Sequence, residues 1–164
     1  MKTIGVLSDT HGLLRSEVLR HLAGSDLIIH AGDVGNPALL ETLAQIAPVH
    51  AVRGNVDKGD WARGLPATEA LEVNGAWLYV LHDLHDLDLV PHEGGFAAVI
   101  SGHSHRPVLE EQGGVLYLNP GSCGPRRFSL PVSMARLRVH PGGRLEGELI
   151  DLSASVPAPQ PGPG

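Results

Sequence analysis

The sequence predicts an α/β protein that begins with alternating strands and helices and continues mostly in strands. Short apolar runs alternate with helix-like patterns over residues 1–53 in the order βαβαβ, and glycine-containing dipeptides separate the later apolar runs. The chain has 164 residues, of which 42% are hydrophobic and 18% charged. This size and composition favour one compact domain and exclude disordered, collagen-like and coiled-coil classes.

The first half of the chain is predicted to contain three strands and two helices. The predicted strands cover 2–8, 27–30 and 49–53, and the predicted helices cover 13–22 and 37–46. Asn36 is a suitable N-cap, because its side chain can accept a hydrogen bond from a free backbone N–H. Pro37 then stands at the first helical position, where its missing N–H costs nothing.

The polar segment 54–64 is predicted to be a turn that interrupts this pattern. Seven strands are predicted after it, at 70–73, 77–82, 97–101, 108–111, 115–118, 132–139 and 145–152. The dipeptides Asn74-Gly75, Gly113-Gly114 and Gly142-Gly143 indicate hairpin turns. We therefore expect pairing that is parallel early and antiparallel late. Residues 153–164 contain four prolines and no charge, so we expect a solvated tail after a single domain of residues 1–152.

Charge and cysteine content limit the classes of partner. Twelve Lys and Arg against 18 Asp and Glu give a net charge of -6, so nucleic acid is a disfavoured partner. The single cysteine, Cys123, excludes an internal disulfide. Because Asp9 interrupts the first apolar stretch, neither a signal peptide nor a membrane span is predicted, and we expect a cytoplasmic protein without a membrane partner. A homo-oligomer stays an open alternative.

Ten histidines beside only six Phe, Trp and Tyr residues direct attention to metal ligands. Many polar side chains follow directly after predicted strands, at the sheet edge where α/β proteins bind ligands. They are Asp9, His11, Asp33, Asn55, Asp57, His82, His103 and His105. Apart from Asp57, these offer a mixed oxygen and nitrogen ligand set that suits Zn, Mn, Fe or Ni. Seven donors are too many for one ion and fit two ions sharing a carboxylate, roughly 3.5–4 Å apart.

The stretches LSDTHG, HAGDV, RGNVD, LHD, SGHSH and LNPGS, in this order, resemble the calcineurin-like metallophosphoesterase superfamily, over residues 2–152. The similarity is strongest to its small single-domain bacterial and archaeal phosphodiesterases. The resemblance implies a four-layer αββα sandwich of two mixed β-sheets flanked by helices. It further implies that Asp9, His11 and His105 hold one metal ion, that Asn55, His82 and His103 hold the other, and that Asp33 bridges them.

Two departures from the family pattern leave alternatives open. Many members have glycine after the histidine of the LHD stretch, whereas this chain has Asp83, and His85 is therefore an alternative ligand to His82. We favour His82, since it directly ends a predicted strand. Larger relatives have a histidine after the Gly-Asn pair that acts as an acid or as a transition-state partner, but Val56 and Asp57 follow here. The acid that protonates the leaving group is thus unassigned.

Further residues are expected near the site in supporting roles. His30 precedes Asp33 by three positions, and we interpret it as a buried group that orients the site. Asn119 either contacts the site or only forms the turn with Pro120. Arg127 either binds a phosphate or faces solvent or another subunit.

Together these features predict a metal-dependent phosphodiesterase that hydrolyses small, nucleotide-like phosphodiesters. Two divalent ions, expected to be Mn with Fe, Zn, Ni or Co as alternatives, would polarise the phosphoryl group, and a hydroxide between them would attack phosphorus in line. Asp33, Asn55 and His82 are the expected catalytic residues. The alternatives are a nuclease, which the net charge disfavours, and a non-catalytic scaffold like the retromer subunit of the same fold, which has lost part of the ligand set.

Overall fold

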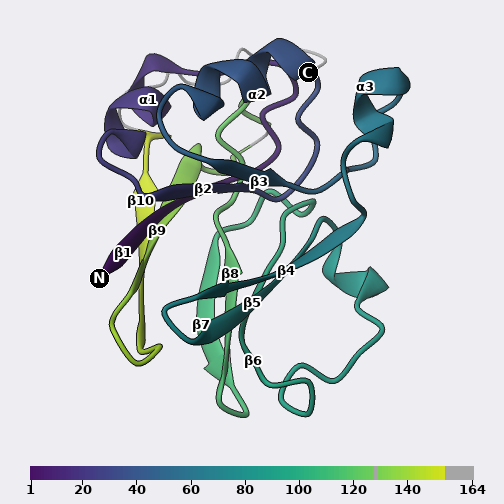
Figure 1. The fold of residues 1–164 in the computed structure, drawn as a ribbon. Helices are drawn as coiled ribbons and strands as arrows, with labels where there is room; N and C mark the ends of the chain where they lie inside the picture. Colours follow the sequence, from purple (N-terminus) through teal and green to yellow (C-terminus); the bar gives the residue numbers. More distant parts are fainter. Residues whose placement is uncertain (128, 154–164) are drawn as a thin grey trace.

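The computed structural model describes residues 1–127 and 129–153, which form two five-stranded sheets packed face to face (Figure 1). The strands are β1 (Lys2–Leu7), β2 (Leu27–His30), β3 (Val49–Ala51), β4 (Thr68–Val73), β5 (Ala76–Leu81), β6 (Phe96–Ile100), β7 (Val108–Gln112), β8 (Val115–Asn119), β9 (Ser133–Val139) and β10 (Leu145–Asp151). The helices are α1 (Ser16–Leu22), α2 (Pro37–Ala44), α3 (Asp60–Arg63) and the 3₁₀ turn η1 (Leu84–Asp86).

Both sheets are mixed. The first has the strand order β10-β9-β1-β2-β3 and the second β4-β5-β6-β8-β7. The predicted parallel pairing of β1, β2 and β3 is confirmed, and so are the three hairpins β4-β5, β7-β8 and β9-β10. The expectation of pairing that is antiparallel late in the chain is only partly met, because β5, β6 and β8 pair in parallel. The long connection after β5 and the return of the chain through β7 allow this, and neither leaves a local sequence signal.

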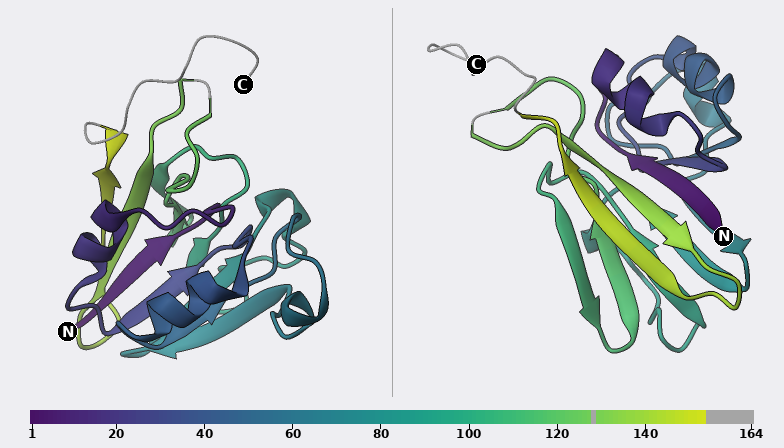
Figure 2. Two further views of the ribbon diagram at one scale, coloured as in Figure 1. Left: turned by 90° about the horizontal axis from the view of Figure 1, so that it is seen from above. Right: turned by 90° about the vertical axis from the view of Figure 1, so that its left-hand side faces the viewer.

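The main core lies between the two sheets. Ile4 and Ile29 of the first sheet pack with Leu78 and Ile100 of the second, and all four are fully buried. The helices α1 and α2 cover the outer face of the first sheet (Figure 2). On the outer face of the second sheet, the loop after η1 packs on an aromatic cluster that contains Tyr79, Phe96 and Tyr117. The predicted class, an α/β fold built on two mixed sheets, is confirmed.

Differences from the predicted elements are small and local. The segment 54–64 contains α3, a helix of four residues that begins after Gly59 with φ at 97° and is too short to show helical periodicity. The helix predicted from 13 begins at Ser16. Ser153, assigned above to the tail, accepts a hydrogen bond from the Val132 N–H at 2.9 Å, and the remainder of the predicted tail lies outside the described residues. No helix in the described ranges has the length and apolar character needed to cross a membrane.

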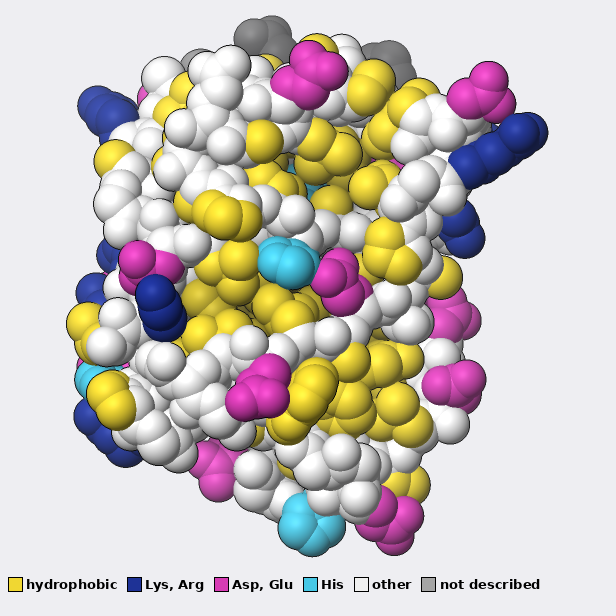
Figure 3. All heavy atoms as spheres, viewed as in Figure 1, with side chains coloured by type: hydrophobic (Ala, Val, Ile, Leu, Met, Phe, Trp, Pro, Cys, Tyr) yellow, Lys and Arg dark blue, Asp and Glu magenta, His cyan; other side chains and the backbone are white. Residues whose placement is uncertain are grey.

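The edge strands β3 and β4 of the two sheets face each other across a hollow with hydrophobic side chains at its floor (Figure 3). A cavity of about 330 Å³ lies there, lined in part by Leu27, Leu71 and Val73. His50 of β3 crosses to β4, with its Nδ1 atom 2.5 Å from Glu69 Oε1. This contact joins the edge strand of the first sheet to that of the second.

Candidate metal centre

The topology brings the ends of β1, β2, β3, β5 and β6 to one edge of the molecule, and every predicted ligand follows one of these strands. The loop after β1 runs beside the loop after β2. The backbone N–H of Asp9 donates to the Gly32 carbonyl, and that of His11 donates to the Asp33 carbonyl, both at 2.9 Å. These backbone bonds fix the spacing of the two carboxylates.

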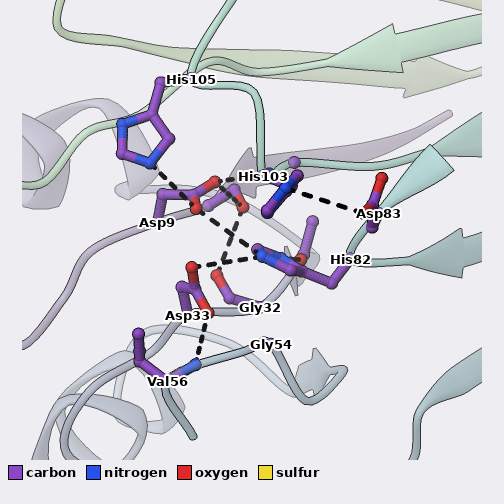
Figure 4. A network of polar contacts seen from close by, with 12 residues as sticks. Asp9, Gly32, Asp33, Gly54, Val56, His82, Asp83, His103 and His105 are labelled. Atoms are coloured by element: carbon purple, nitrogen blue, oxygen red, sulfur yellow. Dashed lines mark hydrogen bonds and ion pairs between the residues drawn. The ribbon is translucent and has the colours of Figure 1, made fainter. Parts of the chain in front are cut away.

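The carboxylates of Asp9 and Asp33 and the imidazoles of His11, His82 and His105 converge at this edge. Figure 4 shows Asp9, Asp33, His82 and His105 from close by. The Oδ1 atom of Asp9 lies 3.3 Å from His105 Nε2, 3.8 Å from His11 Nε2 and 4.0 Å from His82 Nε2. The Oδ2 atom of Asp33 lies 3.2 Å from His82 Nε2 and 3.5 Å from His11 Nε2. Asp9, His11 and His105 form one group with donor atoms close enough to share an ion, and Asp9, Asp33 and His82 form another.

Several of these atoms are buried and unsatisfied. Within residues 1–127 and 129–153, four buried side-chain atoms have no hydrogen-bond partner, and three of them belong to predicted ligands: Asp9 Oδ1, His11 Nε2 and His82 Nε2, the fourth being Arg126 Nε. Buried polar atoms normally have partners, so three unpartnered atoms within these two donor groups indicate a missing ligand. Carboxylate oxygen and imidazole nitrogen are donors for divalent transition metals. The residues present therefore fit a metal ion.

The backbone at the predicted ligands is strained. Asp9, His11, Asp33, His103 and His105 adopt positive φ angles between 46° and 70°. Among the other described residues, Asn74 in the β4-β5 turn is the one further non-glycine position with positive φ. Left-handed backbone at such residues costs about 1–3 kcal/mol each, and it persists where function requires the geometry. Five costly conformations at five predicted ligands thus support a functional role for this edge.

Hydrogen bonds from neighbouring groups orient the ligands. Asp9 Oδ2 accepts from Ser8 Oγ at 2.6 Å and from the His103 N–H at 3.1 Å, so Oδ1 faces the imidazoles. His82 Nδ1 lies 2.7 Å from the Ala31 carbonyl, to which it donates, and this leaves Nε2 with a free lone pair in the neutral ring. Ser8 was not predicted as a site residue. Its position at the end of a buried strand, directly before Asp9, is the sequence signal that could have found it.

The electrostatics reflect this crowding. Burial raises the pKa of Asp33, but the contact with His82 and the hydrogen bond from the Val56 N–H outweigh it, so its pKa lies far below its ordinary value. Burial lowers the pKa of His82, whereas Asp33 and the Ala31 carbonyl raise it, and the result is a raised pKa. A metal ion here would compete with a proton on His82, so binding is expected to depend on pH.

Glycines beside the ligands are needed because of close packing. A Cβ on Gly54 would clash with Asp33, and a Cβ on Gly102 would clash with Ser8 and Asp9. Gly12, by contrast, has φ at 84° and open space around it. Gly12 therefore serves a turn, while Gly54 and Gly102 permit close approach of the backbone to the carboxylates.

The remaining predicted ligands are less enclosed. The His103 side chain is 43% exposed, and its Nε2 atom lies 3.7 Å from Asp83 Oδ2, while its ring packs edge to face on that of His82. Asn55 is exposed and lines a cavity of about 250 Å³ together with His82 and Asp83. The structure brings His82 against both carboxylates. The alternative His85 is 94% exposed and contacts Asp83.

The supporting residues have distinct positions. His30 is fully buried, its Nε2 atom lies 3.0 Å from Thr10 Oγ1, and its Nδ1 accepts from the Gly32 N–H. Asp57 is buried and accepts hydrogen bonds from the backbone N–H groups of Val34, Gly35 and Gly54. Both residues thus hold the loops that carry the ligands.

Asn119 and Arg127 differ in role: Asn119 supports a loop that carries ligands, whereas Arg127 lies at the surface. Asn119 donates to the Gly102 carbonyl at 3.0 Å and to Ser104 Oγ at 3.1 Å, and so it holds the loop that contains His103. Arg127 is exposed. Burial lowers the pKa of His11, and the charge of Arg127 acts in the same direction, which places this guanidinium within electrostatic reach of the centre.

Comparison with known proteins agrees with this geometry. The model of the calcineurin-like phosphoesterase superfamily domain matches residues 1–142. A probable metallophosphoesterase of Methanocaldococcus jannaschii is 37% identical over 162 residues, which span 91% of this chain and 81% of that protein. A phosphodiesterase of the same organism is 26% identical over 138 residues, or 73% of this chain and 83% of that protein.

Solved structures share the fold. A novel archaeal phosphodiesterase superimposes with a TM-score of 0.74 at 22% identity, covering 90% of this chain and 99% of that one. Vps29 of Entamoeba histolytica, complexed with zinc, superimposes with a TM-score of 0.71 at 22% identity, covering 91% and 98%. At this level of identity the likeness concerns the fold alone.

Proposed function

This chain belongs to the calcineurin-like phosphoesterase superfamily, and from that premise we propose that it is a dinuclear, metal-dependent phosphodiesterase that hydrolyses small phosphodiesters. The observation that carries the proposal is the convergence of unpartnered carboxylate and imidazole atoms at one sheet edge, with left-handed backbone at five of the seven proposed ligands. The relative named as a phosphodiesterase supports the reaction class.

We assign one ion to Asp9, His11 and His105 and the other to Asn55, His82 and His103, with Asp33 shared. The shared role of Asp33 is supported by its Oδ2 atom, which lies within 3.5 Å of one histidine from each set. The mixed donors suit Mn, with Fe, Zn, Ni or Co as alternatives. Bound divalent ions would supply Lewis acidity and lower the pKa of a coordinated water.

The protein groups around the centre would position the phosphodiester. Asp9 and Asp33 are held by backbone and hydroxyl donors, so their remaining oxygens point at the centre without rearrangement. Arg127 offers positive charge on the solvent side, where a phosphodiester anion would approach. We assign it to phosphate binding.

Asp57 does not qualify as the acid for the leaving group. Its carboxylate oxygens accept three backbone N–H groups and are committed to holding the loops. A positioned acid typically contributes 10²- to 10⁴-fold to rate, and without one the departing oxygen leaves as an anion. Aryl diesters should then turn over faster than alkyl diesters, and we choose an aryl diester as the assay substrate.

The decisive experiment is metal analysis followed by an activity panel. The protein, stripped of metal and reloaded with Mn²⁺, Fe²⁺, Zn²⁺, Ni²⁺ or Co²⁺, is assayed with bis(4-nitrophenyl) phosphate, 4-nitrophenyl phosphate and single-stranded DNA. We expect metal-dependent turnover, fastest with the diester. Metal binding without turnover of any substrate would favour the scaffold alternative, and faster cleavage of DNA would favour a nuclease.

A further inference from the structure

A second cavity adjoins the candidate metal centre, on the outer face of the second sheet. It has a volume of about 440 Å³ and lies between the loop that contains Asp83 and Leu87 and the strands β7 and β8. Asp83 and His103 line it at one end, and the ring of His103 packs against that of the ligand candidate His82. The cavity therefore borders the candidate metal centre, where the proposed function places the phosphodiester.

We propose that this cavity receives an uncharged aromatic substituent of the phosphodiester, such as an aryl group or a nucleobase, and that it excludes anionic substituents. The inference rests on the function proposed above and specifies its substrate class. A volume of this size lies within the range of small-molecule sites and accommodates a planar ring system.

The walls favour an aromatic group. Leu84, Leu87 and Tyr117 line the cavity, and Leu87 and Tyr117 belong to the aromatic and aliphatic cluster that covers this face of the sheet. The Leu84 side chain is large, apolar and 42% exposed, so an occupant that covered it would remove apolar surface from water. The Tyr117 ring offers a face or an edge for aromatic contact.

The charges restrict what can enter. Two carboxylates, Asp83 and Glu110, line the cavity, and Lys and Arg are absent from its described lining. Glu110 Oε1 accepts a hydrogen bond from Gln112 Nε2 at 2.7 Å, so Glu110 keeps a second oxygen as an acceptor. A substituent with a carboxylate or a further phosphate would face like charge, whereas a ring with N–H donors would find an acceptor.

The proposal is tested by binding of simple phosphate esters to the Mn²⁺-loaded protein, measured by calorimetry. The ligands are methyl phosphate, phenyl phosphate and 4-carboxyphenyl phosphate, which differ only in the substituent. We expect phenyl phosphate to bind at least about tenfold more tightly than methyl phosphate, and 4-carboxyphenyl phosphate to lose most of that gain.

Variants assign the preference to the cavity. Leu84→Asp should reduce the ratio of phenyl to methyl affinity toward one, and Glu110→Gln should restore affinity for 4-carboxyphenyl phosphate. Leu149→Asp, at a similarly exposed leucine on β10 that does not line the cavity, is the matched control and should keep the wild-type ratio.

The outcomes separate the two proposals. If the loaded protein hydrolyses bis(4-nitrophenyl) phosphate but binds phenyl and methyl phosphate equally, the cavity assignment is overturned and the proposed function stands. Equal behaviour of Leu84→Asp and Leu149→Asp would overturn it as well. If no metal supports hydrolysis of the diester, the proposed function fails, and this inference fails with it.

Discussion

The two predicted ligand sets differ in how completely the protein forms them. The donor atoms of Asp9, His11 and His105 lie within sharing distance of one another, on backbone that is already left-handed at all three residues. In the other set, His82 contacts both carboxylates, but Asn55 is exposed and the His103 ring lies closest to Asp83. Under the proposed assignment, the first site is the more preorganised, and the second must order the side chains of Asn55 and His103 when it fills. Because ordering costs conformational entropy, we expect unequal affinities for the two ions.

Removing the shared carboxylate should have the largest effect, since it affects both sites. Asp33→Asn keeps the side-chain volume but removes the charge beside His11 and His82. We expect loss of most bound metal and a fall in turnover beyond the roughly 10- to 100-fold typical of losing an outer-shell partner. Metal content and kcat measured on a variant with native circular dichroism check this. Retention of two ions and near-normal turnover would exclude the bridging role.

The next prediction tests whether His82 or His85 belongs to the ligand set that contains Asn55 and His103. His82→Ala removes the imidazole that contacts Asp33, and activity at ordinary metal concentration should be lost. His85→Ala removes a ring that is 94% exposed, so metal content and turnover should be unchanged. Metal analysis of both variants decides the matter, and the reverse pattern would transfer the ligand role to His85.

The close packing behind Asp33 can be tested without changing a ligand. In Gly54→Ala the new Cβ would clash with Asp33 and displace its carboxylate, so we expect a loss of metal affinity of at least about tenfold. The matched control is Gly64→Ala, where φ is -75° and a Cβ would meet its nearest neighbour at an ordinary 3.6 Å. Metal titration of both variants is the measurement. Equal metal affinities of the two variants would show that the backbone shifts to accommodate the new Cβ without displacing the Asp33 carboxylate.

The last prediction concerns folding stability and not metal binding, and its subject is the buried His30. Burial lowers its pKa from 6.5 to about 4, so the folded protein holds the neutral ring. Its contribution to stability is fully present above pH 6.5 and is lost as the pH falls from 6.5 to about 4.

The shift corresponds to about 3 kcal/mol of unfolding free energy. Denaturant unfolding of metal-free wild type and His30→Gln between pH 7 and 4 should therefore show a steeper decline for wild type. Parallel curves would refute a neutral, buried role for His30.

Local signals explain what could be predicted of the fold. The hairpins after Asn74 and before Val115 follow from their turn dipeptides, and the cap at Asn36 accepts from the Ala38 N–H as expected. The parallel pairing of β5, β6 and β8 could not be predicted, because it depends on long connections and on packing between sheets. The turn α3 was missed because four residues carry too little periodicity.

The candidate site, like the fold, could be predicted from the sequence only in part. The strand-end positions of Asp9, Asp33 and His82 follow from the pattern of apolar runs, and the structure brings these three together. The orientation of Asn55 and His103 does not follow, since it depends on side-chain torsions in loops. Nor could the sequence show that Asp57 is committed to three backbone N–H groups, because those donors come from two separate loops.

Calorimetric titration of the metal-free protein with Mn²⁺, followed in parallel by hydrolysis of bis(4-nitrophenyl) phosphate, tests the central claim most directly. We predict two ions per chain that bind in unequal steps, with activity appearing as the second, weaker step fills. Full activity with a single ion per chain, or two ions bound without any hydrolysis, would contradict the account.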